Sequence, residues 1–157
     1  MAEPLAYFLT WTTYGTWLPG DERGWVDKHE SGSARPYQPP DHRKNALAKS
    51  RMAEPPVTLT LQMRLIADRA IRETCDYRAW LIHALNVRTN HVHIVITAPH
   101  ATPGDAMGNL KAYATRALNG LGRRKHWWTE DGSKRYLNDP RSLEAAIRYA
   151  QDQDKAH

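Results

Sequence analysis

Two apolar segments rich in β-favouring residues, 77–87 and 91–98, are separated by a link of only three residues (88–90). A link this short cannot cross over a sheet, so it predicts a hairpin of two antiparallel strands. Segments with helical spacing of apolar residues lie on both sides, at 60–72 and 102–121. The chain is therefore constrained to an antiparallel sheet covered by helices.

The remaining segments complete this architecture. Leu5 to Thr13 is aromatic and threonine-rich, which favours a first strand. Residues 127–137 predict a strand, or a hairpin with a turn in its middle, and Asp139 with Pro140 predicts the start of a last helix. The order β, excursion, α, β, β, α, β, α predicts an α+β fold of the ferredoxin-like split βαβ type. We expect a largely antiparallel sheet with its helices on one face.

Residues 18–56 interrupt this pattern. They contain six of the ten prolines and no sustained periodicity, so we expect a long irregular insertion with at most short local elements, either functional or disordered. The 157 residues suffice for one core, which predicts a single domain over 1–157. No apolar run approaches 18 residues and the first 19 are too polar for a signal peptide, so we expect a cytosolic protein that does not enter a membrane.

The strongest chemical signal is Asn90-His91-Val92-His93 at the start of an apolar strand. Alternate side chains share one face of a strand, so His91 and His93 project together while Val92 projects to the other face. Two adjacent imidazoles can bind one divalent metal ion, although such a pair also arises by chance among eight histidines. Burying both rings without a ligand or hydrogen bonds is costly, which favours the metal site.

The last helix carries Tyr149 and Gln153, which lie about 40° apart at one edge of its apolar face. A tyrosine in this position is typically an amphipathic residue at the edge of a core, so the helix pattern by itself does not establish a catalytic pair. Tyr113, about 70° from the centre of its helix's apolar stripe, is a competing tyrosine for which we expect a packing role.

Positive charge is concentrated in one stretch. The net charge is +5, and residues 111–135 contain seven cations against two acids. Cations interleaved with aromatic rings are typical of single-stranded nucleic-acid binding, while the alternative is a solvated surface with its tryptophans in the core. The candidate DNA-binding residues are Lys111, Arg116, Arg123, Arg124, Lys125, Trp127, Lys134 and Arg135.

Five stretches, in this order and over nearly the full chain, resemble the REP-associated tyrosine transposases. These enzymes belong to the single-tyrosine HUH transposases of the insertion-sequence type, where U is a bulky apolar residue. The matching stretches are Thr12–Asp21 with Arg23–Val26, Asn90–His93, Leu110–Asn119, Gly132–Leu137 and Ala146–Tyr149. No single stretch is specific, but their order is.

The resemblance implies an HUH endonuclease fold and a metal-dependent single-stranded DNA endonuclease and strand transferase. His91 and His93 match the HUH metal ligands, Tyr149 matches the nucleophile that forms a 5′-phosphotyrosine, and Gln153 matches the amide that completes the metal site. Imidazole, amide and phosphate ligands suit Mg²⁺ or Mn²⁺. The implied partner is hairpin or repeat-element DNA, bound by a monomer or homodimer in the bacterial cytoplasm at the nucleoid.

Two other functions remain open. An HUH replication initiator or relaxase-like nickase would share the histidine pair and the tyrosine but act on other DNA. A non-catalytic module that binds single-stranded nucleic acid would need exposed aromatic rings on its sheet, where this chain places histidines. A single cysteine, Cys75, excludes an internal disulfide and a thiolate metal cluster.

Overall fold

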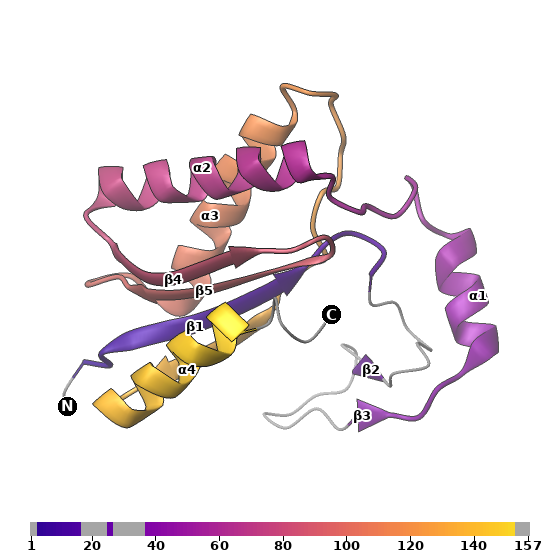
Figure 1. Cartoon of the computed structure of the whole chain (residues 1–157). Coiled ribbons are helices and arrows are strands. Elements are labelled where there is room, and N and C mark those ends of the chain that lie inside the picture. Colours follow the sequence, from indigo (N-terminus) through magenta and orange to yellow (C-terminus); the bar gives the residue numbers. More distant parts are fainter. Residues whose placement is uncertain (1–2, 17–24, 27–36, 153–157) are drawn as a thin grey trace.

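The computed structural model describes residues 3–16, 25–26 and 37–152. Its centre is a four-stranded sheet in the order β4-β5-β1-β6, in which all neighbours are antiparallel (Figure 1). The strands are β1 (Ala6–Thr12), β4 (Leu81–Val87), β5 (His91–Thr97) and β6 (Ser133–Leu137). The antiparallel α+β architecture and the hairpin between β4 and β5 are confirmed.

Helices cover both faces of the sheet (Figure 1). On one face α2 (Leu61–Arg78) and α3 (Pro103–Leu118) bury the larger core cluster, and on the other α4 (Pro140–Asp152) buries a smaller one. The prediction that all helices lie on one face is therefore wrong for α4. The strands explain the difference. Successive residues of β1 and β5 point to opposite faces, and apolar side chains on each face must be shielded from water by a helix.

The boundary between α2 and β4 differs from the sequence prediction. The helix continues to Arg78, and β4 begins only at Leu81, not at Tyr77. Ala79 adopts a left-handed conformation with φ 58°, and the amide of Trp80 donates to the Cys75 carbonyl at 2.8 Å, which ends the helix. Helices usually end on glycine in this conformation, so alanine conceals the end from a sequence pattern.

Residues 127–137 follow the edge of β1 instead of folding into a hairpin. Trp128 bridges Thr13 just beyond β1, and β6 pairs with β1 itself, so the strand alternative is confirmed, with an irregular stretch in between. A Cβ on Gly132 would lie 2.6 Å from the Thr10 carbonyl oxygen, so only glycine fits where this stretch rejoins β1.

The described part of the 18–56 segment contains short elements. Strands β2 (Trp25–Val26) and β3 (Tyr37–Gln38) pair with each other, and helix α1 (His42–Ser50) follows. Helix α1 has no buried residue and stands apart from the helices that cover the sheet (Figure 1). Within the described residues, no helix is long and apolar enough to span a membrane.

Candidate active site

The two histidines lie on the sheet face that α4 covers. His91 and His93 alternate with Val92 on β5, and their ring centroids are 4.6 Å apart. The opposing residues of β1 are Thr12 and Thr10, respectively. The prediction that the two imidazoles share one face is therefore confirmed. Both lie on β5, which is a central strand of the sheet next to β1.

Hydrogen bonds orient both rings through the same nitrogen. The Nδ1 atom of His93 shares a 2.8 Å hydrogen bond with the Thr10 hydroxyl, and Nδ1 of His91 donates to the Asn90 side-chain oxygen at 2.7 Å. Because an amide oxygen only accepts, Nδ1 of His91 carries a proton, and in the neutral ring Nε2 carries the lone pair. Metal-binding histidines are typically fixed in this way by an oxygen behind the ring.

His93 is held in its neutral form. Its side chain is 6% exposed, and this burial, together with His91 and Arg88, lowers its pKa to about 4. Desolvation penalises the charged imidazolium, and the neighbouring positive charges act in the same direction. Only neutral imidazole can ligate a metal, so the site supplies this ligand throughout the physiological pH range.

Helix α4 brings Tyr149 to the histidines. The Tyr149 ring lies 5.7 Å from the His93 ring and 5.9 Å from the Phe8 ring, centroid to centroid. The Asn86 side-chain amide donates to the Ala150 carbonyl at 2.9 Å, which ties this part of the helix to β4. Tyr149 remains 53% exposed, so its phenol is next to the imidazoles and also open to solvent.

The start of α4 is fixed by the predicted cap. The Asp139 carboxylate accepts from the Ser142 amide at 2.8 Å, and Pro140 opens the helix. Hydrogen bonds from the amide and the hydroxyl of Ser142 lower the pKa of Asp139. The predicted apolar face of the helix is confirmed: Ala146 and Ala150 are buried, with Leu143 and Ile147 packed against the same cluster. The sequence thus fixes both the start and the rotation of the helix that carries Tyr149.

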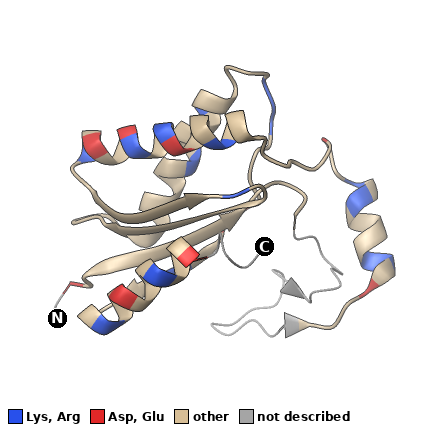
Figure 2. Cartoon of the chain, in the orientation of Figure 1, with Lys and Arg blue, Asp and Glu red and all other residues tan. Residues whose placement is uncertain are grey.

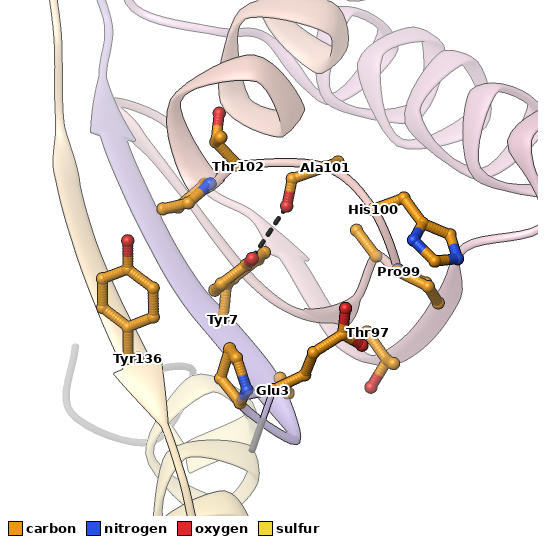
Figure 3. A pocket seen from close by; sticks show the side chains of 12 residues that line it. Glu3, Tyr7, Thr97, Pro99, His100, Ala101, Thr102 and Tyr136 are labelled. Carbon is orange, nitrogen blue, oxygen red and sulfur yellow. Dashed lines mark hydrogen bonds between the residues drawn. The ribbon is translucent and has the colours of Figure 1, made fainter. Parts of the chain in front are cut away.

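Two other tyrosines occupy different environments. Tyr113 lies on α3, which covers the opposite face, and the Arg116 guanidinium sits over its ring at 5.6 Å. The Tyr7 hydroxyl donates to the Ala101 carbonyl at 2.7 Å, and burial raises its pKa (Figure 3). Tyr7 lines a cavity of about 240 Å³ at the opposite end of β1 from His91, and none of the predicted site residues that the structure describes lines that cavity.

Gln153 lies outside the described residues. Among the residues that are described, no group of three or more His, Cys, Asp or Glu side chains could hold a metal ion. Of the residues that the structure describes, the imidazole pair is therefore the donor set, with both rings oriented through Nδ1 and with His93 neutral. These features fit two of the ligands of a divalent metal ion.

Three of the predicted DNA-binding residues make contacts within the domain. Trp127 is 3% exposed and its indole donates to the Asn119 side chain, so it has no face on which a base could stack. The Lys111 ammonium donates to the carbonyls of Thr129 and Asp131, and burial lowers its pKa to about 8. The Arg124 guanidinium donates to two carbonyls and sits over the Trp127 ring. The predicted stacking by Trp127 is wrong because the ring belongs to the core.

The other predicted cations lie at the surface. Arg116, Arg123, Lys125 and Arg135 are exposed, while Lys134 forms an ion pair with Asp131. Arg135 stands opposite Phe8 in the sheet register and therefore on the same face as the histidines and Tyr149. Of these cations, Arg135 is thus the one on the face that carries the candidate chemistry.

Sequence reasoning missed two residues that build the site. Thr10 orients His93 from the neighbouring strand, and Asn86 anchors α4 next to Tyr149. Both contacts join segments more than 60 positions apart, so no local pattern indicates them. Asn90 forms part of the recognised motif, but its role in orienting His91 also emerges only from the structure.

Comparison with known proteins decides the family. A model of the family described as "Transposase IS200 like" matches residues 56–139, more than half of the chain. The chain belongs to this family. The matched region includes both histidines and ends before α4, so the match does not extend to Tyr149.

One solved structure supports the same fold, and a second is similar at a lower score. A REP-associated tyrosine transposase bound to a REP hairpin is 12% identical to this chain, with a TM-score of 0.59 over 99% of this chain and 70% of the other. A putative transposase from Deinococcus radiodurans R1 is 15% identical, with a TM-score of 0.49 over 98% and 93%. A search of curated proteins finds no match. The resemblance predicted from the sequence is thus confirmed at the level of family and fold.

Proposed function

We propose that this chain is a metal-dependent single-stranded DNA endonuclease and strand transferase in which Tyr149 is the nucleophile. The observation that carries the proposal is the contact of the Tyr149 ring with the ring of His93, beside His91, on a face where the phenol stays half exposed. A nucleophile next to neutral metal ligands and open to solvent is an arrangement suited to attack on a DNA phosphate.

The chemistry follows from the phenol. Its oxygen attacks the scissile phosphorus and loses its proton, while the bond from phosphorus to the 3′-oxygen breaks and that oxygen leaves as a hydroxyl after taking up a proton. The product is a 5′-phosphotyrosine. Because the phosphodiester bond energy is retained in this link, attack by another 3′-hydroxyl rejoins the DNA and releases the tyrosine without a nucleotide cofactor.

A divalent metal, Mg²⁺ or Mn²⁺, would be held by His91 and His93 through their Nε2 atoms. When bound it would polarise the scissile phosphate and neutralise developing charge, which matters because a phenol with a reference pKa of about 10 is a weak nucleophile at neutral pH. Thr10 and Asn90 fix the two rings from behind. The sequence match of Gln153 makes its amide the candidate for a further ligand.

The substrate we propose is hairpin-bearing repeat DNA. The support is the family match together with the similar structure, which holds a REP hairpin. Arg135 lies on the same face as Tyr149 and would contact the phosphates of an unpaired strand that reaches the phenol. Arg123 and Lys125 are exposed cations outside this face and could contact flanking DNA.

The test is formation of a covalent adduct. Purified protein is incubated with Mn²⁺ and a 3′-labelled DNA that carries a hairpin and a single-stranded flank, and labelled protein is sought on a denaturing gel. We expect wild type and Tyr113→Phe to become labelled and Tyr149→Phe to bind the DNA without labelling. Chelation of the metal, or His91→Ala with His93→Ala, should also abolish the adduct. Labelling of Tyr149→Phe, or loss of labelling only in Tyr113→Phe, would refute the assignment.

A further inference from the structure

Helix α1 has no role in the hydrophobic core. None of its nine residues is buried, and its one large apolar side chain, Leu47, is 48% exposed. A helix of this length is marginal in water unless packing stabilises it. Its local stabilisation comes from Asp41, whose carboxylate accepts from the amides of Arg43 and Lys44, each at 3.1 Å. The folding of the sheet domain therefore does not explain why α1 is there.

The charge of α1 is not explained by helix stability either. Residues 42–51 contain four cations and no acid. Arg43 and Lys44 stand in the first turn, where the helix dipole disfavours positive charge, and that turn itself contains no acidic residue, since Asp41 is the N-cap just before it. A sequence chosen for helix stability would place acids at these positions, so the cations point to an anionic partner.

The cations share one side of the helix. At 100° per residue, Arg43, Lys44 and Arg51 fall within an arc of about 100°, and all three are exposed. Lys49 lies at least about 120° from each of them and lines a cavity of about 450 Å³ together with residues 52–56. The three cations therefore lie on a different side of the helix from Lys49, and Figure 2 marks the Lys and Arg positions along α1 in blue.

The segment after α1 is attached to the domain by specific contacts. The Glu54 carboxylate accepts from the amides of Lys125 at 3.1 Å and His126 at 2.7 Å. The amide of Ala53 donates to the Tyr14 hydroxyl at 3.2 Å, and the Tyr14 ring stacks on His126. These contacts hold the end of α1 beside the loop that carries exposed cations.

We propose that α1 binds the duplex stem of a DNA hairpin through the phosphates contacted by Arg43, Lys44 and Arg51. A helix of about 10–12 Å diameter fits a major groove about 12 Å wide. Residues 42–51 contain no Phe, Tyr or Trp, so the helix lacks the rings on which unpaired bases stack. This inference rests on the proposed function, because it takes hairpin DNA as the substrate.

The experiment compares salt dependence of binding without metal, so that no cleavage occurs. The variant Arg43→Gln/Lys44→Gln/Arg51→Gln and wild type are titrated with a tailed hairpin and with the single-stranded tail alone. Loss of three duplex phosphate contacts should flatten the log-log salt slope by about 2.7. Between about 50 and 200 mM salt, the hairpin affinity of wild type should then fall about 40-fold more than that of the variant.

Two further variants control the comparison. Arg69→Gln/Arg72→Gln/Arg78→Gln removes three exposed cations from α2 and should behave like wild type. Arg43→Lys/Arg51→Lys keeps the charge and should keep the slope. Because α1 contains no buried residue, each variant should keep the melting temperature of wild type. Its circular dichroism spectrum should differ at most by the contribution of α1.

The outcomes separate this inference from the proposed function. A selective loss of hairpin affinity and slope in the α1 variant supports the inference. A wild-type slope, or an equal loss on the tail alone, overturns it. If the α1 variant loses hairpin binding while wild type forms no covalent adduct, only the proposed function fails. If the adduct forms and the α1 variant binds hairpins normally, only this inference fails.

Discussion

The two faces of the sheet are built from the same strands but differ in composition and cover. Under α2 and α3, β5 presents Val92, Ile94 and Ile96, all without exposed surface. Under α4 the same strand presents His91 and His93, and α4 leaves Tyr149 half exposed. One alternating sequence thus separates a face that stabilises the fold from a face that carries candidate chemistry. Substitutions on the first face should act on stability and those on the second on activity.

The largest expected effect is on the face under α2 and α3. Ile94→Ala removes a side chain with no exposed surface in the centre of the sheet, so the free energy of unfolding should fall by about 4 kcal/mol. Urea unfolding measures this loss. Leu65→Ala, at a position 62% exposed on α2, should change it by less than about 0.5 kcal/mol. Similar losses in both variants would contradict the assignment of this face to stability.

On the face under α4, burial of His93 should make the free energy of unfolding depend on pH in the acid range. The folded pKa of His93 is about 4, below its ordinary value near 6.5, so the unfolded state binds the proton more readily. Stability from this group is complete above about pH 6.5 and is lost as the pH falls toward 4. Between pH 7 and about pH 4.5, wild type in chelator should lose about 2 kcal/mol more than His93→Gln. Parallel pH profiles from urea unfolding would show that His93 is not buried as described.

The smallest expected effect on stability follows from removing the Asn86 hydrogen bond that joins β4 to α4. Asn86→Ala removes the hydrogen bond to the Ala150 carbonyl and should cost about 1 kcal/mol of unfolding free energy. The rate of adduct formation should fall about 10-fold, because Tyr149 would be held less closely over His93. Asn109→Ala removes an amide contact within α3 and a hydrogen bond from Arg78 of α2, both on the other side of the sheet, and should leave this rate unchanged. Equal effects of the two variants on the rate would argue against a positioning role for Asn86.

Local patterns predicted the parts of the site that depend on periodicity. Alternation on β5 placed the two histidines on one face, and the Asp139 cap with the apolar stripe of α4 placed Tyr149 at the edge of a core. The partners of these residues could not be predicted in the same way. Thr10 and Asn86 act through strand register and helix docking, which depend on packing of the whole chain.

Other differences have equally physical reasons. Trp127 lies among cations in the sequence, which is typical of nucleic-acid binding, but its indole fits the core and bonds Asn119. Helix α1 was not predicted because helix recognition relies on an apolar stripe, and α1 buries none. The charge of α1 was also concealed, since acids elsewhere in residues 18–56 offset its cations.

The central claim is that Tyr149 is the residue that becomes joined to DNA. Mass spectrometry of the adduct after nuclease and trypsin digestion tests it directly. Cleavage after Arg148 and Lys155 releases residues 149–155, and this peptide should carry the mass of a nucleotide remnant on Tyr149. A remnant on the peptide of residues 112–116, which contains Tyr113, or on any other tyrosine would contradict the account.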